Sequence, residues 1–109
     1  MGSVITREKP LMSETREAAK RLCRWADESG LKALPHPGQV VELKKGKQSQ
    51  HVRLSRAEGG WFWFWLWEPF RTEQDVWETE KGLPMGQERD MARRVLAVLE
   101  IAEAGEKVS

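Results

Sequence analysis

Residues 59–68 constrain the fold more than any other stretch, because they read GGWFWFWLWE. Tryptophan stands at every second position from Trp61 to Trp67, and two phenylalanines and a leucine stand between them. Neighbouring side chains of a β-strand point to opposite faces, so one face carries four indole rings and the other carries three smaller apolar side chains. The run of seven apolar residues is too short to cross a bilayer. The stretch therefore predicts a two-faced strand in a globular domain.

Two segments near the ends of the chain have the spacing of amphipathic helices. The first follows Ser13, a favourable N-cap residue, and is expected to end before Gly30. Its apolar stripe comprises Ala19, Leu22, Cys23 and Ala26. The second is expected over residues 87–104, with Gly105 as its end. Its stripe comprises Met91, Val95, Val98, Leu99 and Ala102.

Between these helices the hydrophobic period changes to two. Residues 39–44, 50–56 and 61–67 are rich in β-branched and aromatic residues, and glycine-containing turns separate them. This pattern predicts an antiparallel meander. Residues 34–38 contain two prolines and are expected to form a rigid connector, and the acidic segment 68–86 is expected to form a loop.

These elements predict a single two-layer α+β domain in the order α-β-β-β-α, a three-stranded antiparallel meander packed on one face by two helices. The domain would span residues 13–104, between an N-terminal arm (residues 1–12) and a C-terminal tail (residues 105–109). The element order resembles that of the double-stranded RNA-binding domain, in topology only. That resemblance implies RNA binding. No residue of that family is carried over, because residues 87–90 read Gln-Glu-Arg-Asp where the family has basic residues.

The length of the turn before the tryptophan strand decides which face of that strand is buried. A two-residue or four-residue loop places the tryptophans on the same face as Val52 and Leu54, and a three-residue loop places the phenylalanines there. Glu58 is a poor first residue for a type I′ turn, so we favour the three-residue loop. In that register the tryptophans lie on the face away from the helices, beside His51 and Arg53.

Charge and cysteine content restrict the class of protein. The net charge is +1, but residues 1–56 carry +6 and residues 57–109 carry −5. Such segregation suits either a polyanion or a protein partner. The single cysteine, Cys23, cannot form an internal disulfide, and the first residues are charged where a secretory leader would be apolar. We therefore expect a cytoplasmic protein without membrane association.

Four exposed indoles would form a larger apolar patch than a monomer usually tolerates. Either residues 1–12 and the 68–86 loop cover the patch, or a partner does. We predict a small protein-interaction module, with a regulatory or accessory role, that binds a protein partner or forms a homodimer. The predicted partner-binding residues are Trp61, Trp63, Trp65, Trp67, Arg53 and His51.

The alternative is a nucleic-acid-binding protein in which aromatic rings stack on bases and basic side chains contact phosphates. The predicted contact residues are Lys44, Lys45, Lys47, Arg53 and Arg56. A net charge close to zero argues against this alternative.

The sequence contains no recognisable catalytic, cofactor-binding or metal-binding motif. The only histidines are His36 and His51, and His36 lies between two prolines, where we interpret it as a turn residue. We expect no enzymatic activity, no cofactor and no metal.

Overall fold

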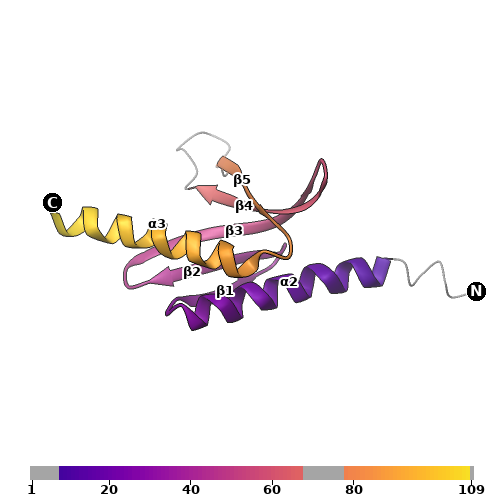
Figure 1. Cartoon of the computed structure of the whole chain (residues 1–109), viewed down its shortest axis with the longest axis horizontal. Coiled ribbons are helices and arrows are strands. Elements are labelled where there is room, and N and C mark those ends of the chain that lie inside the picture. The colour runs from indigo at the N-terminus through magenta and orange to yellow at the C-terminus, as the bar shows by residue number, and fades with distance from the viewer. Residues whose placement is uncertain (1–7, 68–77, 109) are drawn as a thin grey trace, which may run out of the picture.

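The computed structural model describes residues 8–67 and 78–108 of the 109-residue chain. The elements are α2 (Glu8–Glu28), β1 (Lys32–His36), β2 (Val40–Lys45), β3 (Gln48–Ala57), β4 (Gly60–Trp67), β5 (Glu78–Pro84) and α3 (Glu88–Val108). The strands form one antiparallel sheet in the order β1-β2-β3-β4-β5, and both helices pack on the same side of it (Figure 1). The prediction of a single α+β domain with two helices on a meander is confirmed. The predicted three-strand order is wrong, since the meander has five strands.

The two additional strands are the two edges of the sheet. β1 occupies the predicted connector and pairs with β2 from Lys32↔Lys44 to His36↔Val40. Pro35 lacks a backbone N–H, which an edge strand tolerates because one of its sides has no partner. β5 occupies the end of the predicted acidic loop, and its ladder with β4 is interrupted by a β-bulge. A Cβ at Gly82 would lie 2.7 Å from the carbonyl oxygen of Trp63, so only glycine permits this approach.

Both helices are longer than predicted. α2 begins at Glu8, before the predicted N-cap Ser13. α3 continues through Gly105 to Val108, because a single glycine in a helix costs only about 1 kcal/mol. Residues 1–7 of the predicted arm, residues 68–77 of the predicted loop and residue 109 lie outside the described residues. Neither helix in the described part of the chain is long and apolar enough to span a membrane.

The turn between β3 and β4 is shorter than predicted. Ala57 pairs with Gly60, which leaves a two-residue loop of Glu58 and Gly59. Gly59 and Gly60 adopt φ angles of 96° and 132°, whereas Glu58 is not at positive φ. The glycines therefore take the left-handed conformations, and Glu58 is no obstacle to the short turn. The predicted three-residue loop is wrong.

The short turn places the tryptophans beneath the helices. Trp63 lies opposite Leu54 and Trp65 lies opposite Val52, and these two indoles are 0% and 6% exposed. Trp61 and Trp67 are partly buried at the margin of the same core. The expected exposed tryptophan face is therefore wrong, and the face away from the helices carries the other side chains of β4, Phe62, Phe64 and Leu66.

A buried carboxylate connects β4 to both helices. Glu88, the first residue of α3, is 1% exposed. Its Oε2 accepts hydrogen bonds from Trp63 Nε1 at 2.9 Å and from the backbone N–H of Gly86 at 2.7 Å. Its Oε1 accepts one from Arg21 Nε of α2 at 2.8 Å. A carboxylate is stable inside a protein only when it is paired and hydrogen-bonded in this way.

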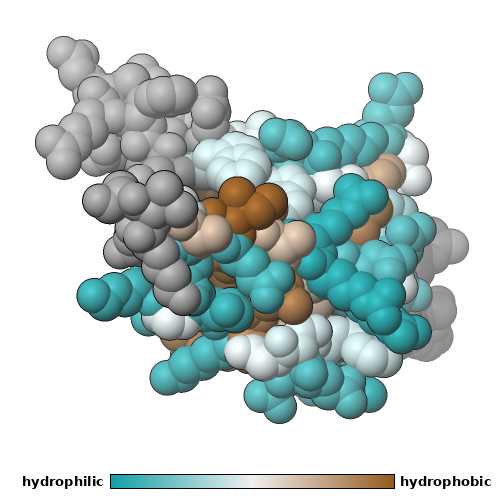
Figure 2. Space-filling model, turned by 60° about the vertical axis from the view of Figure 1, so that its left-hand side comes forward, coloured by the Kyte–Doolittle hydropathy of each residue, from teal (hydrophilic) through white to brown (hydrophobic). Residues whose placement is uncertain are grey.

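The core lies between the sheet and the two helices. Its largest fully buried side chains are Trp63, Leu22, Leu43, Leu54, Met91 and Leu99. Further apolar side chains are partly buried around it, and Ile101 of α3 is 73% exposed. Figure 2 shows apolar surface in the middle of one side of the molecule, with hydrophilic side chains around it.

The register predicts opposite outcomes for two adjacent aromatic residues. Trp65→Ala removes a buried indole and should lower the free energy of unfolding by about 3–5 kcal/mol. Phe64→Ala removes a partly exposed ring from the other face and should cost clearly less. Urea unfolding of both variants measures the difference. A larger loss for Phe64→Ala would mean that the phenylalanine face is the buried one.

Removal of the Glu88 carboxylate should be one of the most costly single changes in the protein. Glu88→Ala leaves the Trp63 indole N–H and the Arg21 guanidinium without their acceptor, and such losses cost about 3–5 kcal/mol. Glu100→Ala is the matched control, because Glu100 is an exposed glutamate of the same helix and should change stability by less than about 0.5 kcal/mol. Equal unfolding midpoints for the two variants would contradict this role of Glu88.

Candidate functional site on the open face of the sheet

The candidate site is the face of the sheet that the helices do not cover, which we call the open face. Strand pairing places on it the side chains of β3 and β4 that alternate with the core residues, from His51↔Leu66 to Ser55↔Phe62. Among the described residues its basic side chains are Lys32, Lys44, Arg53 and Lys81, and its carboxylate is that of Glu42. The open face is therefore apolar at β4 and positively charged around it.

An aromatic pair forms one half of the open face. Phe62 and Phe64 of β4 are both partly exposed. Lys81 of β5 places its Nζ 3.9 Å from the centroid of the Phe62 ring. Arg53 lies opposite Phe64, and its Nε donates a hydrogen bond to Ser55 Oγ at 3.0 Å. Cations beside exposed aromatic rings are typical of surfaces that bind other molecules.

Two histidines and a glutamate form the other half. Glu42 of β2 lies directly opposite His51 of β3. On β1, Leu34 lies opposite Glu42, and His36 follows two residues later on the same face. Glu42 Oε1 lies 3.0 Å from His36 Nε2 and 3.8 Å from His51 Nε2. The two imidazole rings have centroids 5.9 Å apart. Three neighbouring strands thus each contribute one side chain with a metal-ligating atom to the same point of the open face.

The electrostatics of this cluster favour an ionised Glu42. The hydrogen bond from His36 is the main cause that lowers the pKa of the Glu42 carboxyl below its ordinary value. Partial burial raises this pKa, the fields of His51, Lys44 and His36 lower it further, and the net shift is downward. The carboxylate is thus a stable acceptor between the two imidazoles.

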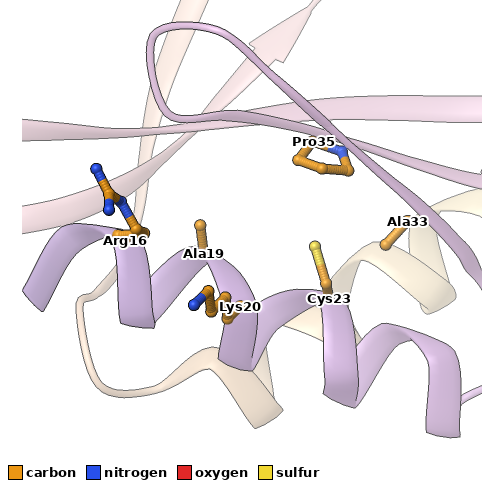
Figure 3. Close-up of a pocket in the computed structure, with 6 residues that line it drawn as sticks. All are labelled: Arg16, Ala19, Lys20, Cys23, Ala33 and Pro35. Atoms are coloured by element: carbon orange, nitrogen blue, oxygen red, sulfur yellow. The ribbon is translucent and has the colours of Figure 1, made fainter. Parts of the chain in front are cut away.

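A separate pocket lies at the other side of β1, between this strand and α2. It has a volume of about 440 Å³ and is lined by Arg16, Ala19, Lys20, Cys23, Ala33 and Pro35. Figure 3 shows Ala19 and Cys23 of α2 pointing toward Pro35 of β1. Burial raises the pKa of the Cys23 thiol, because a low-dielectric environment disfavours the thiolate. The pocket is therefore an apolar hollow with a poorly reactive thiol.

The structure separates the predicted partner-binding residues. Arg53 and His51 lie on the open face, as predicted. The tryptophans that were expected beside them lie on the helix side of β4, where Trp63 and Trp65 are buried. The role of these six residues in partner binding stays a prediction.

The residues of the nucleic-acid alternative are also divided between surfaces. Lys44 and Arg53 share the open face. Lys45 points to the helix side, where its Nζ lies 3.2 Å from Glu103 Oε2 of α3. Lys47 lies in the turn between β2 and β3, and Arg56 pairs with Trp61 on the helix side of the sheet. These five side chains do not form one basic surface.

Sequence reasoning missed His36 and Glu42 as parts of a site. The reason is the assignment of residues 34–38 to a connector, which removed β1 from the sheet and left His36 without neighbours. The available signal was a possible hairpin between residues 32–36 and 40–45. It pairs Leu34 with Glu42 and places His36 on the same face, but the prolines beside His36 obscured it.

Comparisons of the chain with protein-family models, with curated proteins and with solved structures found no significant match.

The raised pKa of Cys23 predicts a slow thiol. At pH 7–8 the folded protein should react with iodoacetamide more slowly than N-acetylcysteine does, because less of the thiol is ionised and the sulfur is partly buried. Mass spectrometry of alkylation against time, in buffer and in denaturing urea, measures the effect. Equal rates for the folded and unfolded chain would contradict it.

Proposed function

We propose that this protein is a small, non-enzymatic interaction module that binds an acidic and partly apolar segment of another protein on its open face. The observation that supports the proposal is the pair of partly exposed rings, Phe62 and Phe64, within a group of basic side chains. Aromatic and arginine side chains supply most of the energy in protein interfaces. The rings would contact apolar side chains of the partner, and the cations would meet its carboxylates.

The charge of the open face favours a different protein over a second copy of this chain. Lys32, Lys44, Arg53 and Lys81 carry four positive charges against the one carboxylate of Glu42 among the described residues. Two copies that met face to face would oppose these like charges, which costs free energy. A partner with Asp or Glu around its apolar residues is complementary.

Single-stranded nucleic acid is the second candidate. The observation in its favour is the same set of groups, since rings flanked by arginine and lysine can also stack on bases. Lys45 and Arg56 lie on the helix side of the sheet, which argues against it, because a phosphate backbone requires a continuous basic surface.

A random peptide library displayed on phage and selected against the full chain tests the proposal. We expect the selected peptides to be enriched in Asp or Glu next to aromatic or aliphatic residues. Arg53→Glu and Phe64→Ala should each weaken binding of such a peptide about tenfold or more, as measured by fluorescence polarisation.

Two variants on the helices are matched controls for this experiment. Arg24→Glu makes the same charge change on an exposed position of α2, and Ile101→Ala truncates an exposed apolar residue of α3. Both should leave the affinity unchanged within about twofold. Peptides without acidic residues, or equal effects of the control variants, would refute the proposal. Tight binding of oligonucleotides with a steep salt dependence would support the second candidate instead.

A further inference from the structure

The convergence of His36, Glu42 and His51 has the composition and spacing of a metal site. Each residue comes from a different strand, and the potential ligand atoms all lie within 4.8 Å of one another. Protein zinc sites place each nitrogen or oxygen about 2.0–2.2 Å from the ion, so tetrahedral ligand atoms are about 3.3 Å apart. The two distances from Glu42 Oε1, 3.0 Å and 3.8 Å, lie on either side of that value.

The backbone around these three residues is well held. Glu42 and His51 are paired directly in the β2–β3 ladder, so their side chains leave the sheet at adjacent points. His36 is the last residue of β1, and Pro35 and Pro37 on either side of it restrict the φ angles of the chain. Small side-chain rotations would therefore be enough to bring the ligand atoms to an ion.

The site is open to ions from solvent. The side chains of His36, Glu42 and His51 are 42%, 18% and 26% exposed. Arg53, the next residue of β3 on this face after His51, directs its Nε to Ser55 on the side away from the cluster. Three protein ligands leave a fourth coordination position for water or for a ligand atom from another molecule.

We propose that His36, Glu42 and His51 bind one Zn²⁺ ion on the open face. Imidazole nitrogens with a single carboxylate suit zinc and its transition-metal neighbours, whereas Ca²⁺ and Mg²⁺ require more oxygen ligands than this cluster offers. This inference goes beyond the proposed partner binding and does not depend on it, because the rings of Phe62 and Phe64 contribute no ligand.

Calorimetric titration of the tag-free, metal-stripped full chain with ZnCl₂ tests the proposal. We expect one ion per chain, and a visible d–d absorption spectrum of a low-coordinate site when Co²⁺ replaces Zn²⁺. His51→Ala and Glu42→Gln should each weaken Zn²⁺ binding about a hundredfold or more, since each removes one of three ligands. Glu42→Gln keeps the shape of the side chain, so it remains informative if His51→Ala fails to fold.

Cys23→Ser is the control for another source of zinc affinity. Cys23 lies in the pocket between α2 and β1, away from the open face, so this variant should bind Zn²⁺ like the unmodified chain. Zinc should also raise the thermal unfolding midpoint of the unmodified chain and leave that of Glu42→Gln unchanged. The proposal is overturned by binding weaker than millimolar at neutral pH, by unchanged affinity in Glu42→Gln, or by loss of affinity in Cys23→Ser.

Discussion

The buried carboxylate of Glu88 is the interaction on which the rest of the structure depends. A buried indole N–H requires an acceptor, and Trp63 finds it in Glu88 Oε2. The same carboxylate accepts hydrogen bonds from Arg21 of α2 and from the backbone N–H of Gly86, in the turn before α3. These bonds hold the central tryptophan of β4, the first turn of α3 and the middle of α2 in one arrangement. A shift of β4 by one residue would turn the Trp63 indole to the other face of the sheet, and the carboxylate would lose one of its three donors.

This constraint also decides which side chains lie on the open face. With the tryptophans of β4 directed to the helices, the alternate residues of every strand lie on the other side of the sheet. That side holds Phe62, Phe64 and Arg53 at one end and the His36, Glu42 and His51 cluster at the other. The larger rings thus stabilise the fold, and the smaller aromatic, basic and imidazole groups lie on the open face.

Much of this fold was predictable from the sequence, and the exceptions have physical causes. Helical periodicity located both helices, and alternation located β2, β3 and β4. The two edge strands were not predicted, because β1 contains Pro35 and β5 contains Gly82. These residues disfavour a strand in the middle of a sheet but are tolerated at its edge. The turn was misjudged because the two glycines, not Glu58, take the positive φ angles. His51 and Arg53 were placed on the correct face, whereas the cluster with His36 required knowledge of β1.

The edges of the sheet explain why a partner is expected on its face. Free edge strands invite pairing with another chain, and proteins prevent this with proline, lysine and bulges. β1 has Pro35 on one edge, and β5 has Lys81, Pro84 and an irregular register on the other. Part of the basic charge on the helix side is neutralised locally, by Arg21 with Glu88 and by Lys45 with Glu103. Both edges thus oppose strand addition. Among the described residues, the four basic side chains of the open face stand against the single carboxylate of Glu42, which is the charge that the proposed acidic partner would complement.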